Sequence, residues 1–167
     1  MKASYVLNKS EIRKGAGYHY DYRHRLQWII TFLIGFALLA FGIFFLLEGR
    51  VESSAIVLVL IGFYLLLNRV FYKWRAAAAV FKGRPGPLNV EMEIQDDGIF
   101  METEISNGMT KWGGLMDLKI VPDGLLLYPQ RNLFYWIPAN AEIKGGSWTD
   151  FALGLERRYQ AAKSQVK

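Results

Sequence analysis

The sequence of 167 residues has no cysteine and only two histidines, His19 and His24. The absence of cysteine excludes disulfide bonds, thiolate catalysis and zinc sites built on cysteine. The spacing of His19 and His24 places their imidazoles on different faces of a helix and on opposite faces of a strand, so it does not favour a metal site that includes Asp21. The sequence also lacks a P-loop, a Ser-His-Asp set and a GxSxG motif. We therefore predict a protein that is not an enzyme and has no cofactor or metal.

The net charge of +5 and the pI near 9.4 suggest an acidic partner, either nucleic acid or anionic lipid. The basic residues are unevenly placed. Residues 1–25 carry six basic and two acidic side chains, residues 69–84 carry five basic and no acidic ones, and residues 85–167 carry eight basic and eleven acidic ones. Because the C-terminal half is acidic, nucleic acid is not the expected partner.

Two apolar runs explain why 52% of the residues are hydrophobic. Residues 26–47 are uncharged and would reach about 33 Å as a helix, enough to cross a bilayer. Residues 55–67 form a shorter run, which the polar residues on either side lengthen to 52–69, about 27 Å. The sequence Leu46-Leu47-Glu48 after the first run is not a signal-peptide cleavage site. We predict a transmembrane hairpin over 26–74 with a short outer turn at 48–52.

Basic residues gather at the two ends of this hairpin, which the positive-inside rule places in the cytoplasm. The predicted order is a cytoplasmic N-terminal segment (1–25), the hairpin (26–74), a helix end and linker (75–87) and a cytoplasmic domain (88–167). A cluster of glycine and proline at 82–87 marks the domain boundary. Gly35, Gly42 and Gly62 allow close helix packing, within the hairpin or between two copies of the chain, and we favour the hairpin.

A basic collar of arginine, lysine and aromatic side chains is predicted at the cytoplasmic membrane surface. Such residues fix topology and attract anionic lipid headgroups. The topology role is the simpler explanation. The collar consists of Arg23, Arg25, Trp28, Arg69, Tyr72, Lys73, Trp74 and Arg75.

The C-terminal part predicts an antiparallel meander followed by a helix. Alternating or apolar runs separated by turns predict strands at 90–95, 99–105, 109–112, 115–121, 125–128 and 133–137, and residues 3–7 could add a seventh. Carboxylate pairs such as Glu91 and Glu93 share a strand face, and their alternation with apolar residues indicates a solvent-facing surface rather than acid–base catalysis. Ser147 and Asp150 predict a capping box at the start of the last helix.

The order of these elements, with Lys111-Trp112, the turn Pro122-Asp123-Gly124, the run 125–128 and the Ile137-Pro138 pair, resembles the YcxB-like membrane proteins of bacteria. The resemblance implies a membrane α-helical hairpin joined to an α+β cytoplasmic domain. That domain would be an antiparallel sheet similar to pleckstrin-homology (PH) domains, closed by the C-terminal helix. Together with the charge distribution, which places both termini in the cytoplasm, the resemblance implies a bacterial inner-membrane location, and it brings no catalytic residues.

We predict the first of the following three functions and keep the other two as alternatives. The first is an interaction module that binds a protein partner through aromatic side chains of the sheet, namely Trp112, Tyr128, Phe134, Tyr135 and Trp136. The second is an immunity protein against a toxin that acts at the membrane. The third is an enzyme acting on lipid headgroups, which the cluster of His19 and His24 suggests.

Overall fold

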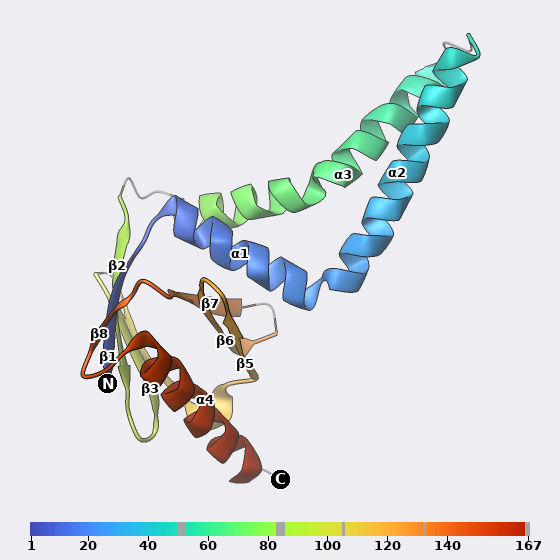
Figure 1. The fold of residues 1–167 in the computed structure, drawn as a ribbon. Coiled ribbons are helices and arrows are strands. Elements are labelled where there is room, and N and C mark those ends of the chain that lie inside the picture. Colours follow the sequence, from blue (N-terminus) through green and yellow to red (C-terminus); the bar gives the residue numbers. More distant parts are fainter. Residues whose placement is uncertain (50–52, 83–85, 105, 132, 166–167) are drawn as a thin grey trace. The chain divides into compact units, whose positions relative to one another are not determined.

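The computed structural model describes residues 1–49, 53–82, 86–104, 106–131 and 133–165 (Figure 1). Part of the predicted outer turn at 48–52 and part of the glycine and proline cluster at 82–87 lie outside the described residues. The chain divides into two units. One contains residues 1–15 and 77–167, and the other contains residues 16–76. The N-terminal residues thus belong to the same unit as the C-terminal sheets.

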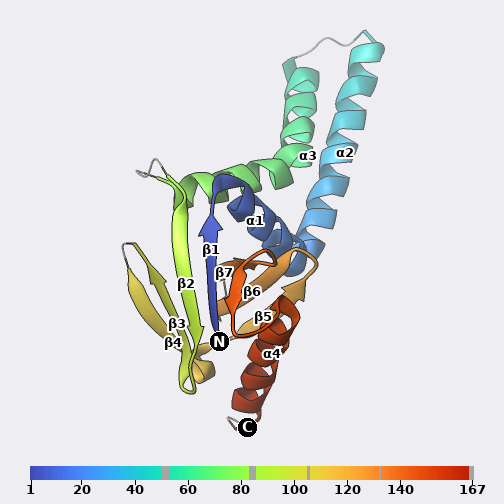
Figure 2. The ribbon, with the colours of Figure 1, turned by 60° about the vertical axis from the view of Figure 1, so that its left-hand side comes forward.

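The sheet-containing unit has eight described strands in two antiparallel sheets (Figure 2). The first sheet has the order β4-β3-β2-β1-β8 and the second has the order β5-β6-β7. The strands are β1 (Lys2–Leu7), β2 (Leu88–Ile94), β3 (Gly98–Thr103), β4 (Asn107–Lys111), β5 (Asp117–Val121), β6 (Gly124–Gln130), β7 (Leu133–Pro138) and β8 (Glu142–Lys144). The antiparallel prediction is confirmed. The sequence patterns did not predict β8 or the division into two sheets.

In the N-terminal strand β1, residues that are buried in the core alternate with residues on the opposite side of the strand. Ala3, Tyr5 and Leu7 are buried, whereas Val6 is exposed. This alternation turns one side of β1 toward the core. The strand pairs with β2 and β8, with Tyr5 opposite Val90. The expectation that residues 3–7 add a strand to the sheet is confirmed.

The core is densest around β6, the central strand of the second sheet. Leu125, Leu126, Leu127 and Tyr128 are each no more than 1% exposed. Successive strand residues point to opposite sides, so a continuous buried run means that both faces of this strand are covered. The predicted strand at 109–112 ends earlier than expected, because Trp112 begins a short 3-10 turn, η1 (Trp112–Gly114).

The C-terminal helix α4 (Trp148–Gln165) begins with the predicted capping box. The Asp150 backbone N–H donates to Ser147 Oγ at 3.2 Å, and the Ser147 backbone N–H donates to Asp150 Oδ2 at 3.2 Å. Phe151, Leu155 and Tyr159 form its buried stripe, and the helix contacts η1, β5 and β8. The hydrogen bonds from Ser147 hold the pKa of the Asp150 carboxyl below its usual value.

A helix near the N-terminus, α1 (Lys9–Arg23), was not predicted. Asn8 caps it, because Asn8 Oδ1 accepts a hydrogen bond from the Glu11 backbone N–H at 2.9 Å. Ile12, Ala16 and Tyr20 are buried at steps of four residues. The signal was present in the sequence as Asn8 followed three positions later by Glu11, before an apolar stripe.

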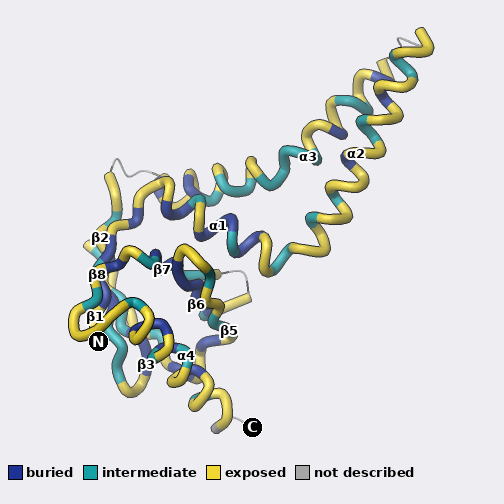
Figure 3. The backbone as a smooth tube through the Cα atoms, in the orientation of Figure 1, coloured by how far each residue is buried: buried dark blue, intermediate teal, exposed yellow. Residues whose placement is uncertain are grey.

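The second unit contains two helices long and apolar enough to cross a membrane, α2 (Arg25–Leu47) and α3 (Ser53–Val80). Only 11% of the most apolar 18-residue stretch of each helix is buried, unlike a core helix of a soluble protein (Figure 3). The buried positions of α2 are Gly35 and Gly42. A Cβ at Gly35 would lie 3.1 Å from the Gly62 carbonyl oxygen, and one at Gly42 would lie 2.9 Å from the Val59 backbone nitrogen. The glycines therefore pack α2 against α3 within the hairpin, as predicted.

Candidate functional site

The basic collar belongs to residues of the unit 16–76, where three helices supply its side chains. Arg23 comes from the end of α1, Arg25 and Trp28 come from the first turn of α2, and the others come from α3. Arg25, Trp74 and Arg75 are exposed, whereas Arg23, Trp28, Arg69, Tyr72 and Lys73 are partly buried. Five of the eight collar side chains are therefore packed against neighbouring residues, and three are open to solvent.

Arg69 is the residue that joins these helices. Its Nη2 forms an ion pair with Asp21 of α1, and its guanidinium carbon lies 5.7 Å from the centroid of the Trp28 ring. Asp21, Arg25, Trp28 and Arg69 line a cavity of about 340 Å³, which we call the collar pocket. Of these four residues, the sequence patterns selected all except Asp21. Asp21 pairs with Arg69, which lies 48 positions later, so no local sequence pattern indicates this contact.

A second cluster shares Tyr72 with the collar and also contains Tyr20, His19, His24 and Asn68. The rings of Tyr20 and Tyr72 are 4.9 Å apart, and the Asn68 side-chain amide donates to the Tyr20 hydroxyl at 3.3 Å. His19 stacks on Tyr72 with centroids 6.3 Å apart and meets His24 edge-on at 5.7 Å. The two histidines do approach each other, which their spacing did not indicate, because α1 ends between them and α2 begins at Arg25.

His19 is only 2% exposed. Burial lowers the pKa of His19 from 6.5 to about 4, and the charges of His24 and Arg23 act in the same direction. The imidazole is therefore neutral at physiological pH. Within the described residues, no group of three or more His, Cys, Asp or Glu side chains is placed to hold a metal ion.

The five aromatic residues proposed as a protein interface have different surroundings. Trp112, Tyr128 and Trp136 are buried, with exposed fractions of 7%, 0% and 2%, so they form core rather than surface. Phe134 and Tyr135 on β7 are half-buried and follow Leu133, which is 45% exposed. The surface-exposed part of the set is therefore at the start of β7.

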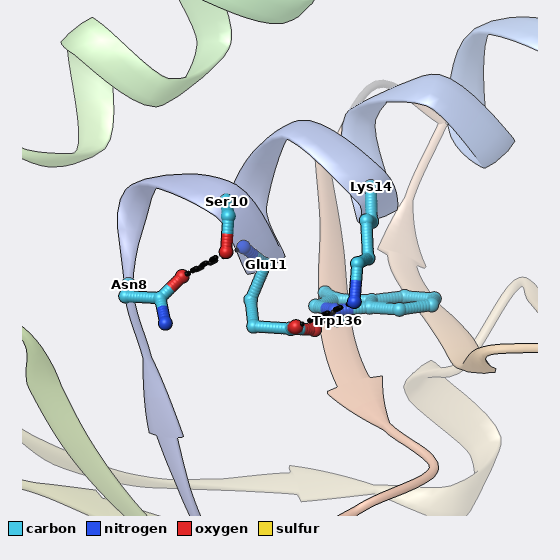
Figure 4. A network of polar contacts seen from close by, with 5 residues as sticks. All are labelled: Asn8, Ser10, Glu11, Lys14 and Trp136. Carbon is cyan, nitrogen blue, oxygen red and sulfur yellow. Dashed lines mark hydrogen bonds and ion pairs between the residues drawn. The ribbon is translucent and has the colours of Figure 1, made fainter.

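The buried ring of Trp136 has an internal partner (Figure 4). Its Nε1 donates to Glu11 Oε2 at 3.2 Å, and Glu11 Oε1 accepts from Lys14 Nζ at 2.9 Å. The hydrogen bond and charge of Glu11 raise the pKa of Lys14. Gly15 gives the ring room, because a Cβ there would lie 2.6 Å from Trp136 Cγ. These contacts dock the first half of α1 on β7.

Comparison with known proteins gives one match. Residues 94–153 match the model of the family described as YcxB-like protein. This segment is YcxB-like. The match confirms the resemblance and runs from the last residue of β2 into α4, through both sheets. The two apolar helices lie outside the matched residues. No curated protein and no solved structure matches the chain.

Proposed function

We propose that this protein is an interaction module anchored in a bacterial inner membrane, with both termini cytoplasmic, and that its YcxB-like segment is part of a PH-like domain that binds a protein partner without catalysis. The observation that carries the anchor is the hairpin of α2 and α3. Many of its large apolar side chains are exposed, and the exposed fractions of Leu33, Phe36 and Phe63 are 56–60%. In water such a surface would be unfavourable, and lipid is the solvent that fits it.

The PH-like character is supported by the order of the elements. Four antiparallel strands β1–β4 belong to one sheet, three strands β5–β7 form another, and a single helix follows. The buried stripe of α4 contacts η1, β5 and β8, and this packing supports a helix that closes the sheets. The hairpin is inserted between β1 and β2, which pair along their whole length.

The proposed partner surface is the start of β7, with Leu133, Phe134 and Tyr135. Among the described strands, β7 pairs only with β6. Leu133 and Tyr135 lie on one side of this strand and Phe134 lies on the other, and all three keep exposed area at a sheet edge, which a partner can contact. The acidic character of residues 85–167 favours a partner with basic side chains around an apolar centre.

The test is co-purification from membranes. Wild-type protein and the variants Leu133→Asp and Tyr135→Ser would be crosslinked in cells and recovered in detergent. The matched control is Leu153→Asp, which places the same charge at an exposed position on α4. A protein recovered with the wild type and the control, but lost with both β7 variants, supports the proposal. Equal recovery with all four proteins contradicts it.

The immunity and lipid-enzyme functions stay predictions. The low pKa of His19 makes it a weak base and its burial limits access by a headgroup, so neither favours it as a catalytic base. Replacing both histidines and finding a loss of headgroup turnover would favour the enzyme. Rescue of cells poisoned by a membrane-acting toxin would favour the immunity protein.

A further inference from the structure

The collar pocket combines features that suit one particular ligand chemistry. Asp21, Arg25, Trp28 and Arg69 line an open pocket of about 340 Å³, within the range of roughly 300–1,000 Å³ that small-ligand sites occupy. The pocket draws on α1, α2 and α3, so it requires the folded unit and is not a property of one basic segment.

The position of the pocket fits a lipid headgroup. Arg25 and Trp28 lie in the first turn of α2, where the apolar run of this helix starts, and Arg69 follows the apolar run of α3. In a membrane hairpin both positions lie at the same boundary between hydrocarbon and water. Leu26, beside the pocket in sequence, is 71% exposed and can contact acyl chains.

The charges of the pocket select the headgroup. Arg69 is held by Asp21 and by the face of Trp28, so its guanidinium is oriented in advance, and its Nε is buried without a hydrogen-bond partner among the described residues. In the described part of the chain, Arg25 makes no ion pair and is exposed. Two guanidiniums and one carboxylate leave a single positive charge in excess, which a phospholipid with one net negative charge balances and a zwitterionic phospholipid does not. A second anionic group would meet the Asp21 carboxylate.

We propose that the collar pocket binds the phosphodiester of a phospholipid with one net negative charge, such as phosphatidylglycerol, with Arg25 and Arg69 as phosphate ligands and Asp21 as the positioning residue of Arg69. This site rests on the membrane anchoring proposed above. It is independent of the protein partner proposed at β7.

The experiment is native mass spectrometry of the full-length protein in detergent with added phosphatidylglycerol, phosphatidylethanolamine or phosphatidylcholine. The wild type is expected to retain one phosphatidylglycerol in preference to the two zwitterionic lipids. Arg25→Gln removes a phosphate ligand without breaking an ion pair of the described residues, and it should weaken retention about ten-fold. Arg69→Gln should do the same, and its folding is checked by thermal unfolding.

The matched control is Arg75→Gln, which removes an equal charge from an exposed position of α3 outside the pocket. It should retain phosphatidylglycerol like the wild type. Equal losses in Arg25→Gln and Arg75→Gln would show general attraction to the basic collar and overturn the proposal. Unchanged retention in Arg25→Gln, equal retention of the zwitterionic lipids, or displacement of phosphatidylglycerol by an equal concentration of glycerol 3-phosphate would also overturn it.

Two further measurements distinguish a failure of the lipid site from a failure of the membrane anchor or of the protein partner. Extraction of membranes with alkaline carbonate reports anchoring, and it should leave the wild type and all three variants in the membrane. Loss of the wild type by this treatment would contradict the anchor itself. Co-purification through Leu133 reports the partner and is expected to be unaffected by Arg25→Gln.

Discussion

At the residue scale, Trp136 illustrates how one side chain can have either of two roles. A large aromatic residue on a short strand is compatible with a contact surface or with a core. The structure buries its ring against Gly15 and pairs its Nε1 with Glu11, a residue 125 positions earlier in the chain. A buried indole N–H needs an acceptor, and the Glu11 carboxylate supplies it.

Replacing Gly15 should therefore destabilise the protein. In Gly15→Ala the new methyl group would meet Trp136 Cγ, and such overpacking costs about 1–3 kcal/mol, more than the roughly 1 kcal/mol that alanine gains over glycine in a helix. Thermal unfolding in detergent measures the difference. Gly17→Ala is the control on the same helix, because its nearest neighbour is the flexible end of Lys73, and it should unfold at the wild-type temperature or above. Equal melting of the two variants would contradict this packing.

His19 makes stability depend on pH. Its pKa is about 4 in the folded protein and 6.5 in an unfolded reference, so between these values the unfolded chain binds more protons. Stability from this group is complete above pH 6.5 and decreases as the pH falls toward 4. His19→Gln should flatten the pH dependence of the denaturant concentration at the unfolding midpoint over that interval. An unchanged slope between pH 6.5 and 4 would show that other groups govern acid unfolding.

At the scale of elements, close helix contact in the hairpin depends on small residues. A Cβ at Gly62 would lie 2.7 Å from the Leu39 backbone nitrogen and 2.8 Å from the Gly35 carbonyl oxygen. Neither backbone atom can move away without separating the helices. Gly35, Gly42 and Gly62 therefore determine how closely α2 and α3 approach each other.

Gly62→Leu should force the helices apart and lower the stability of the folded hairpin. The measurement is the distance between spin labels placed on α2 and α3, which should increase in the variant. Ile61→Leu is the control, because Ile61 is 45% exposed and points away from the contact. If Gly62→Leu leaves the label distance at the wild-type value, the close contact does not exist in the membrane.

At the scale of the whole molecule, the absence of cysteine becomes an experimental advantage. A single introduced cysteine is the only thiol in the chain, so a membrane-impermeant maleimide reports its side of the membrane. In spheroplasts, Glu48→Cys should be labelled before lysis, whereas Ser10→Cys and Ser164→Cys should be labelled only after lysis. The reverse pattern would invert the proposed orientation, and labelling of all three before lysis would contradict a membrane-spanning hairpin.

The sequence by itself determined the apolar hairpin, most of the strands and the capped C-terminal helix. These features depend on local composition and on periodicity of two or of three to four residues, which neighbouring side chains establish without the rest of the chain. The capping box of Ser147 and Asp150 is such a case, and the spacing of Gly35 and Gly42 is another. The start of helix α1 is also encoded locally, because Asn8 and Glu11 have the spacing of a helix cap.

Only the tertiary structure decided which aromatic side chains are buried and which basic side chains share a pocket. Trp136 meets Glu11, and Asp21 meets Arg69, across 125 and 48 positions of chain. Local patterns contain no information about such distances, because side chains far apart in sequence become neighbours only when the chain pairs its strands and packs its helices. The lack of cysteine excludes disulfide bonds, thiolate catalysis and zinc sites built on cysteine. The placement of two arginines, an aspartate and a tryptophan around one cavity, which only the tertiary structure shows, gives a testable site.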